Sequence, residues 1–306
     1  MSTKAVIDIG TNSIKLFVAE LGADGVLRSI ADTNNIARLG EGMGDTGMLQ
    51  PEAMARNAEA VAEFAELARA KGASEVIAVG TMALRTAKNT PEFVAAVRAR
   101  AGIDVQVIPG EQEAELAYLA VLSGLGAYGG ALVICDVGGG SSEFVFGQGD
   151  AVTRRFSINL GAVKVTERFL KSDPPSTAQI DDAVAFIMGE LEAGDVSGEA
   201  SRLVGIGGTV TSMGAVKLEM AEYDADRIQG AVLTAADIDG LIEMFSSMPL
   251  AERKKITGLQ PKRAEVIIGG ACIIKCIMRR LNLSELVMSD RGLRHGLMYK
   301  ILVGGQ

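Results

Sequence analysis

Two stretches of the sequence follow one pattern, and this internal repeat restricts the chain to folds built from two related halves. The first is AVIDIGTNSIKLFVAE (5–20), and the second is LVICDVGGGSSEFVFG (132–147). In each, an apolar run ends in Asp and leads through a glycine-bearing polar turn into a second strand-like run. The matching positions are Asp8 and Asp136, Gly10 and Gly138, and Ser13 and Ser141. The repeat predicts two homologous domains that each begin with a β-hairpin.

The remaining sequence alternates short apolar runs with longer amphipathic stretches. EVIAVG (75–80) is typical of a buried strand, and residues 51–72 form a helical pattern with Pro at the start and Gly at the end. A long helix is expected to begin directly after Pro261, and a terminal helix is expected over 293–306. Alternation of this kind predicts an α/β fold whose strands are covered on both faces.

The predicted domains are residues 1–124 and 125–292, and the terminal helix is expected to pack back on the first domain. The net charge of −8 argues against broad nucleic-acid binding. No apolar run is long enough to cross a bilayer, and the first residues lack the layout of a signal peptide. The three cysteines lie in apolar segments, as expected of buried thiols in a reducing compartment. We therefore expect a cytoplasmic protein without a membrane or nucleic-acid partner.

The glycine turns favour phosphate binding. Without a Cβ, glycine lets several backbone N–H groups converge on one point, and neighbouring hydroxyls add donors. The alternative is a tight hairpin that needs glycine only for its backbone conformation. A single GGG would favour that alternative, but two matching turns favour an anion site. If the repeat is structural, both turns face one interdomain cleft and can clamp adjacent phosphates.

Carboxylates accompany both turns. Asp8 precedes the first, and Asp136 and Glu143 flank the second. Carboxylates beside phosphate-binding loops commonly hold Mg²⁺, which prefers oxygen ligands and shares them with substrate phosphates. Solvation at the surface or capping of the turn is the alternative, but it explains poorly an Asp at the end of an apolar strand.

Six segments in order resemble the motifs of the exopolyphosphatase/guanosine pentaphosphate phosphohydrolase (Ppx/GppA) family. They are AVIDIGTNSIKLFVAE, VGTMALRTAKN, IPGEQEAELAYLAV, VICDVGGGSSEFVFG, GIGGTVTSMGA and MSDRGLRHGLMYKIL. The resemblance runs from end to end and corresponds to the short, two-domain members. It implies two ribonuclease H-like domains of the actin-like ATPase (sugar kinase/actin) superfold with an interdomain cleft.

The resemblance also implies catalytic residues. Glu113, in GEQEAEL, matches the glutamate that activates or orients water, and Arg85 matches an arginine that faces phosphate. Their alternatives are an exposed helical carboxylate, which is expected of Glu111 and Glu115, and a surface arginine. Gln112 and Glu115 depart from the family pattern, as does His295, for which we expect a packing role rather than catalysis.

The implied phosphate-binding residues are Thr11, Asn12, Ser13, Gly138, Gly139, Gly140, Ser141, Ser142, Gly208 and Thr209, where Gly207 opens the third turn. The implied metal ligands are Asp136, Glu143 and Asp8, for Mg²⁺ or alternatively Mn²⁺, with K⁺ as a further candidate ion. Lys262 and Arg263 are expected at the start of the long helix. They could extend a phosphate track, or they could be solvated surface residues.

The implied activity is metal-dependent removal of the terminal phosphate of inorganic polyphosphate, with release of orthophosphate. The alternative substrate is guanosine pentaphosphate (pppGpp), which would connect the chain to the stringent response. A non-catalytic polyphosphate or nucleotide sensor is a third reading, which the combination of Glu113, Asp136 and Glu143 disfavours. A sugar kinase or chaperone-like ATPase would need a further binding domain. A homodimer is a possible assembly.

Overall fold

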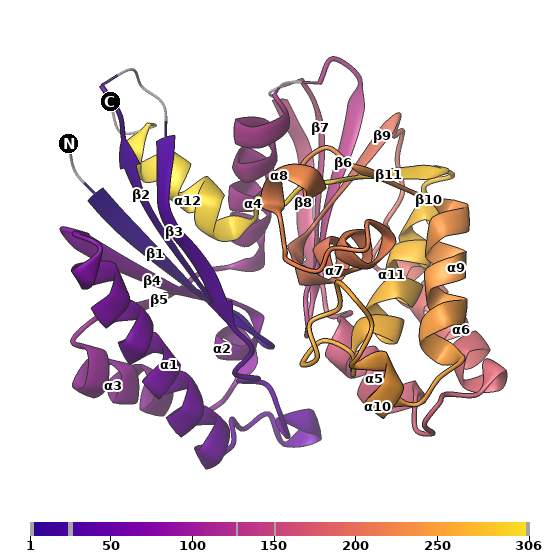
Figure 1. Ribbon diagram of the computed structural model, residues 1–306, viewed down its shortest axis with the longest axis horizontal. Helices are drawn as coiled ribbons and strands as arrows, with labels where there is room; N and C mark the ends of the chain where they lie inside the picture. The colour runs from indigo at the N-terminus through magenta and orange to yellow at the C-terminus, as the bar shows by residue number, and fades with distance from the viewer. Residues whose placement is uncertain (1–2, 24–26, 127, 150, 304–306) are drawn as a thin grey trace. The chain divides into compact units, whose positions relative to one another are not determined.

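The computed structural model describes residues 3–23, 27–126, 128–149 and 151–303, and the chain divides into two compact units. The first unit extends to Ser123 and also includes the chain from Leu293 onward. The second unit is Gly124–Gly292. Each unit contains one mixed β-sheet with helices packed against it (Figure 1).

The sheet of the first unit has the strand order β3-β2-β1-β4-β5. Its strands are β1 (Thr3–Ile9), β2 (Ile14–Leu21), β3 (Leu27–Asn35), β4 (Glu75–Gly80) and β5 (Val105–Val107). The first three form antiparallel pairs, whereas β4 and β5 run parallel to β1. The sequence pattern did not reveal β3, because its residues alternate between half-buried and exposed positions at a sheet edge.

Both faces of this sheet are covered by helices, as the near-continuous apolar run of β1 predicts. The helices are α1 (Pro51–Ala70), α2 (Met82–Thr86), α3 (Thr90–Ala101), α4 (Gly110–Leu125) and α12 (Leu293–Leu302), with a short 3₁₀ turn η1 (Gly44–Thr46). Ile7 and Ile9 pack into the core shared with α1 and α3. Val6 points to the other face, where it joins Met298 of α12.

The sheet of the second unit has the order β10-β11-β9-β6-β7-β8. Its strands are β6 (Ala131–Val137), β7 (Ser142–Gln148), β8 (Ala151–Ile158), β9 (Arg202–Ile206), β10 (Val232–Thr234) and β11 (Glu285–Met288). The antiparallel run β8-β7-β6 followed by the parallel strands β9 and β11 reproduces the arrangement of the first sheet. The internal repeat is therefore a structural repeat, to which β10 adds one antiparallel edge strand.

Helices α5, α6, α7, α9 and α11 pack against one face of this sheet and against one another. The helices of the second unit are α5 (Ala162–Phe169), α6 (Thr177–Ala193), α7 (Gly207–Lys217), α8 (Ala225–Ile228), α9 (Ala235–Ser246), α10 (Leu250–Arg253) and α11 (Ile267–Arg280). The three cysteines are free and buried, as predicted. Burial raises the pKa of the Cys272 thiol to about 12, so this thiol stays protonated at neutral pH.

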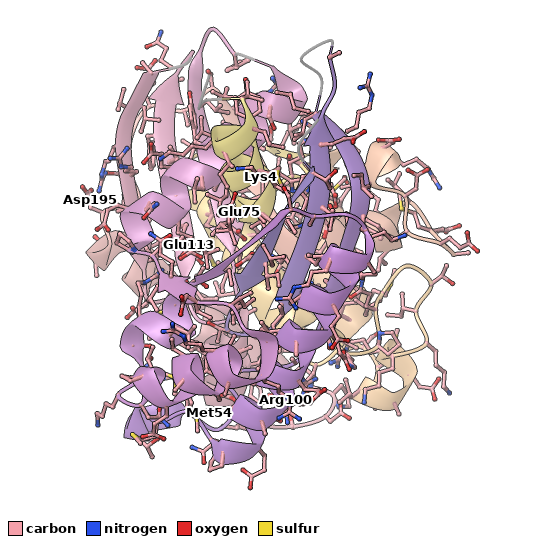
Figure 2. All side chains as sticks on the ribbon, turned by 90° about the vertical axis from the view of Figure 1, so that its left-hand side faces the viewer. Lys4, Met54, Glu75, Arg100, Glu113 and Asp195 are labelled. Atoms are coloured by element: carbon pink, nitrogen blue, oxygen red, sulfur yellow. The ribbon has the colours of Figure 1, made fainter. Side chains whose placement is uncertain are left out.

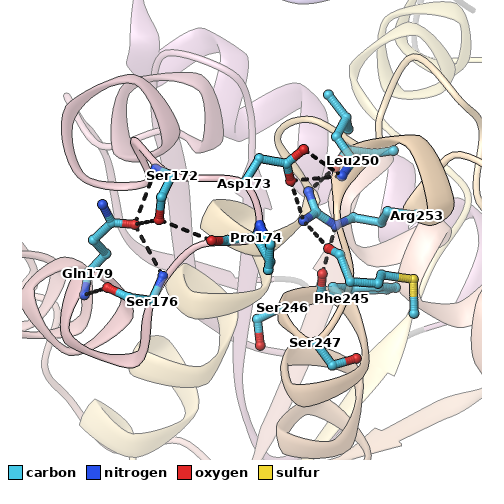
Figure 3. Close-up of polar contacts among 12 residues, drawn as sticks. Ser172, Asp173, Pro174, Ser176, Gln179, Phe245, Ser246, Ser247, Leu250 and Arg253 are labelled. Atoms are coloured by element: carbon cyan, nitrogen blue, oxygen red, sulfur yellow. Dashed lines mark hydrogen bonds and ion pairs between the residues drawn. The ribbon is translucent and has the colours of Figure 1, made fainter.

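The expectation that the long helix begins directly after Pro261 is wrong, because α11 begins at Ile267. Residues 261–266 form turns, and the buried Arg253 takes part in holding them. Its guanidinium donates to the carbonyl of Ala264 at 3.1 Å and to that of Phe245 at 2.7 Å. Figure 3 shows Arg253 of α10 beside Asp173 and Leu250, with Phe245 at the end of α9 next to its guanidinium. Of these two bonds, the one to Ala264 satisfies a carbonyl within residues 261–266 outside any helix.

No helix within the described residues has the length and apolar character that a membrane crossing requires.

Candidate active site

The first glycine turn, Gly10–Ser13, connects β1 to β2. The amide of Gly10 closes it by donating to the carbonyl of Ser13 at 3.0 Å. The carbonyls of Thr11 and Asn12 accept hydrogen bonds from the amides of Gly40 and Arg38 at 2.9 and 3.0 Å. Within the described chain, the amides of Thr11, Asn12 and Ser13 have no hydrogen-bond partner. The turn therefore uses its carbonyls internally and leaves three adjacent donors available.

The second turn, Gly138–Ser141, repeats this arrangement between β6 and β7. Gly138 donates to the carbonyl of Ser141 at 3.0 Å. The carbonyls of Gly138 and Gly139 accept from the first amides of α5, Ala162 and Val163, at 2.9 Å. Gly161 lies so close to Gly139 and Gly140 that a Cβ there would meet their backbone.

Three adjacent amides of the second turn, those of Gly139, Gly140 and Ser141, likewise have no hydrogen-bond partner in the described structure. The hydroxyls of Ser13 and Ser141 are also without hydrogen-bond partners there. Each unit thus presents three adjacent N–H donors with one nearby hydroxyl, and donors of this kind can bind phosphate oxygens.

Ser142 has a different role from the one predicted. It lies opposite Val137 on the core face of the sheet, and its side chain is fully buried. Its hydroxyl donates to the carbonyl of Leu160 at 2.7 Å. Because that donor is already used inside the fold, we assign Ser142 a structural role and exclude it from the phosphate-binding set.

The third turn, Gly207–Thr209, is the first turn of α7. Thr209 donates its hydroxyl to the carbonyl of Val137, so only its amide remains at the helix N-terminus. Gly207 has φ +82°, and a Cβ there would meet the carboxylate of Asp136. The guanidinium of Arg263 covers Gly208. The sequence left the role of Arg263 undecided, and the structure places this positive group over the third turn.

Arg85 and Glu113 lie together in the first unit. Glu113 is in the first turn of α4, and Arg85 is in the last turn of α2. Their side chains form an ion pair of 2.6 Å, with 18% and 12% of the side-chain surfaces exposed. The same Arg85 nitrogen donates to the carbonyl of Ile108 at 3.1 Å, which fixes the guanidinium. Figure 2 labels Glu113 on its helix.

The neighbours of Glu113 differ from it. Glu111 is exposed, as predicted, whereas Glu115 is half-buried and lies 4.0 Å from Lys300 of α12. Glu115, which departs from the family pattern, therefore contacts the terminal helix α12. Glu113 is the glutamate of this turn that the fold pairs with Arg85.

Asp136 and Glu143 face each other across the β6–β7 pair. They are direct register partners, and Ser157 of β8 is the next residue in the same row. Opposed residues of antiparallel strands share a sheet face, so the two carboxylates lie side by side. Glu143 is 3% exposed and accepts a hydrogen bond of 2.9 Å from the Ser157 hydroxyl. Two adjacent carboxylates are a suitable oxygen donor set for Mg²⁺.

Asp8 has a different environment from Asp136. Its register partner is Lys15, whose ammonium lies 3.5 Å from the Asp8 carboxylate. Both side chains are largely buried, so Asp8 already has a cation beside it. The sequence analysis overlooked Lys15, although aligning the two repeats places it at the position of Glu143. The structure brings two of the three predicted metal ligands together and pairs the third with lysine.

His295 has the packing role that the sequence suggested. It is 7% exposed, its ring lies 4.4 Å from that of Phe17, and its Nε2 lies 2.8 Å from the Asp32 carboxylate. Arg294 donates to both oxygens of Asp32. Burial raises the pKa of Asp32, but the hydrogen bond to His295 and the charge of Arg294 outweigh burial and lower it overall.

Comparison with known proteins decides the family. The sequence pattern of the Ppx/GppA phosphatase family matches residues 17–303. The chain belongs to this family. It is 34% identical to a protein named exopolyphosphatase 2 from Mycobacterium tuberculosis, over 96% of each chain. A Ppx/GppA crystal structure from Aquifex aeolicus shares 34% identity with a TM-score of 0.85, covering 100% of this chain and 99% of the other.

A crystal structure described as an exopolyphosphatase-like protein shares 32% identity with a TM-score of 0.91, covering 98% of this chain and 97% of the other. These comparisons confirm the predicted superfold and show that this Ppx/GppA protein is a phosphatase.

Proposed function

We propose that this Ppx/GppA protein is an exopolyphosphatase that hydrolyses the terminal phosphoanhydride bond of inorganic polyphosphate and releases orthophosphate. The observation that carries the proposal is the pair of matching turns, each with three adjacent backbone amides without partners in the described chain. A polyphosphate chain presents oxygens in a regular series, and N–H donors bind them without a requirement for a base or a sugar. The relative named exopolyphosphatase 2 supports the same substrate.

In this proposal, water attacks the terminal phosphorus in line with the leaving oxygen. Glu113 orients the water and accepts its proton, and Arg85 both fixes Glu113 and holds phosphate oxygens. The turn amides and the hydroxyls of Ser13 and Ser141 bind the negative charge of the phosphates.

Asp136 and Glu143 would hold Mg²⁺ or Mn²⁺, which supplies charge neutralisation at the phosphate oxygens. Asp8 is left out of this ligand set because Lys15 occupies the position next to it. Lys15 instead contributes positive charge near the first turn. A K⁺ requirement is tested by replacing K⁺ with Na⁺ in the same assay.

The deciding experiment measures orthophosphate release with Mg²⁺ on polyphosphate and on pppGpp in parallel. We expect Glu113→Gln to lower kcat by about 10²- to 10⁴-fold, the usual contribution of general-base catalysis. Glu111→Gln is the matched control, because Glu111 lies in the same helical turn but is exposed.

Release from polyphosphate that depends on Glu113 but not on Glu111 supports the proposal. If kcat/KM is higher on pppGpp than on polyphosphate, pppGpp is the substrate instead, and the assignment of Glu113 stands. Binding of both compounds without hydrolysis would indicate a sensor and contradict the proposed mechanism.

A further inference from the structure

The segment Ala37–Gly40 is hydrogen-bonded to the first phosphate turn. The amides of Arg38 and Gly40 donate to the carbonyls of Asn12 and Thr11, respectively. A peptide group is planar, so fixing a carbonyl also fixes the N–H of the following residue on the opposite side. The segment therefore sets the direction in which the amides of Asn12 and Ser13 point.

Arg38 has a backbone conformation that is unusual for a residue with a side chain. Its φ is +51°, in the left-handed region. Three other non-glycine residues share this feature in the described chain, namely Asp195, Glu219 and Asn282. Each of those three follows the C-terminal end of a helix by two residues, where this conformation is common.

Arg38 follows a strand and an extended segment, so helix termination does not explain its conformation. Strained backbone of this kind persists only where its surroundings enforce it, and it concentrates at functional sites. At Arg38 it allows two amides separated by one residue to reach two successive carbonyls of the turn.

Helix α1 enforces this conformation through two adjacent side chains. The amide group of Asn57 donates to the carbonyl of Ala37 at 2.9 Å, and Nε of Arg56 donates to the same carbonyl at 2.8 Å. Asn57 is fully buried, and its side-chain oxygen has no partner in the described structure. An apolar residue would avoid that unsatisfied oxygen, so packing alone does not account for asparagine here.

Gly40 completes the arrangement. A Cβ at this position would lie 2.5 Å from Cγ2 of Thr11, so any larger residue there would force the Thr11 side chain to shift. Ala37 and Leu39 alternate with Arg38 and Gly40 and are buried in the core beside α1. Ala37 and Leu39 therefore anchor the segment in the core, while Arg38 and Gly40 contact the turn.

We propose that Asn57 and Arg38 are positioning residues for phosphate binding. Through the segment Ala37–Gly40, they hold the first turn with its amides directed toward substrate, although neither residue needs to contact substrate for this purpose. The inference rests on the proposed function of the turn as a phosphate site. The role of Arg38 lies in its backbone conformation, and the role of Asn57 lies in its side-chain donor.

The experiment compares Arg38→Val with Arg38→Gly. Both variants remove the guanidinium, but glycine adopts the left-handed conformation readily, whereas the β-branched valine adopts it poorly. Hydrogen exchange at the amides of residues 11–13, with and without inorganic tripolyphosphate, reports the turn directly, and KM and kcat on polyphosphate accompany it. In the wild type, we expect tripolyphosphate to slow exchange at these amides.

We expect Arg38→Val and Asn57→Leu to raise KM by about 10-fold or more, the range seen when hydrogen bonds that orient ligating groups are removed. Tripolyphosphate should then protect the turn amides less, while kcat changes little. Arg38→Gly should have a KM at least several-fold lower than that of Arg38→Val. Glu219→Val makes the same kind of change at another left-handed position, and as the control it should leave both the protection and KM unchanged.

Equal KM values for Arg38→Val and Arg38→Gly, or unchanged protection in Asn57→Leu, would overturn the positioning role. Protection of the wild-type turn without hydrolysis would refute the proposed enzyme activity but leave the positioning role standing. Absence of protection in the wild type would refute both.

Discussion

At the scale of single residues, the two repeats differ most at the position that faces the strand-end aspartate. Lys15 faces Asp8 in the first unit, whereas Glu143 faces Asp136 in the second. The same pair of facing positions therefore holds an ion pair in the first unit and two carboxylates in the second. Like charges directly opposite one another destabilise a sheet. A bound cation should consequently stabilise the second unit and not the first.

This contrast predicts the effect of Mg²⁺ on thermal stability. Saturating Mg²⁺ should raise the melting temperature of the wild type, since a ligand at 100 times its Kd adds about 2.7 kcal/mol. Asp136→Asn removes one of the two facing carboxylates and should abolish most of that rise. Differential scanning calorimetry with and without Mg²⁺ measures the effect.

Asp8→Asn is the control for this experiment. It breaks the pair with Lys15 and should lower the melting temperature at every Mg²⁺ concentration, without changing the rise produced by Mg²⁺. If Asp8→Asn abolished the rise and Asp136→Asn did not, the assignment of the metal ligands would be reversed.

At the scale of secondary-structure elements, α9 shows how local and distant contacts define the two ends of a helix. Its N-terminus has a capping box, in which Thr234 and Asp237 accept hydrogen bonds from each other's backbone N–H groups. Its C-terminal carbonyl at Phe245 accepts from the buried Arg253 (Figure 3). The Thr-x-x-Asp pattern predicts the N-terminus of α9 from the sequence. The hydrogen bond at its C-terminus comes from Arg253, which follows the helix in the chain.

The capping carboxylate makes the stability of this region depend on pH. Burial raises the pKa of Asp237, but hydrogen bonds from Lys217 and Thr234 outweigh it and lower the pKa from 3.8 to about 2. A lowered pKa in the folded state means that the stabilisation is complete above about pH 3.8 and is lost as the pH falls toward about 2.

Asp237→Asn should therefore lower the free energy of unfolding at neutral pH by about 1 kcal/mol, the usual contribution of a hydrogen bond. The variant should also lose less stability than the wild type between about pH 3.8 and about pH 2. Urea unfolding at several pH values measures both effects. Glu243→Gln, at an exposed position of the same helix, is the control, and parallel pH profiles for wild type and Asp237→Asn would refute the explanation.

At the scale of the whole molecule, the chain leaves the first unit after Ser123 and returns to it at Leu293. Helix α12 then covers β1 and β2, where Met298 and Leu302 pack on Val6 and Phe17. The chain order therefore makes folding of the first unit depend on a segment that follows the entire second unit. Contacts of such long sequence separation are slow to form.

Met298→Ala tests this dependence. Met298 is fully buried, so the change should lower the stability of the first unit by about 2–5 kcal/mol, as is typical of large-to-small core substitutions. Hydrogen exchange should show faster opening of β1 and β2 with little change in β6 and β7. Lys300→Ala, at a more exposed position of the same helix, is the control. Equal effects of Met298→Ala on both units would show that they unfold as one.

Much of the fold could be predicted from the sequence, because its signals are local. Alternating apolar residues around Asp-x-Gly-x-x-Ser define each hairpin and its turn, and the repeat defines two related α/β units. The motif order was sufficient to predict the family, which the comparisons confirm. The aspartates and glycines at the strand ends were identified for the same reason.

The tertiary structure decided what these residues contact. The carbonyl of Ala264, just before α11, accepts from Arg253, the hydroxyl of Ser142 donates to Leu160, and the carboxylate of Asp8 faces Lys15. The direction of the first turn depends on Arg38, whose conformation requires hydrogen bonds from α1. Sequence patterns report which residues are polar, buried or flexible along the chain. They do not report which donor reaches which acceptor once distant segments pack together, and those pairings determine the chemistry of the site.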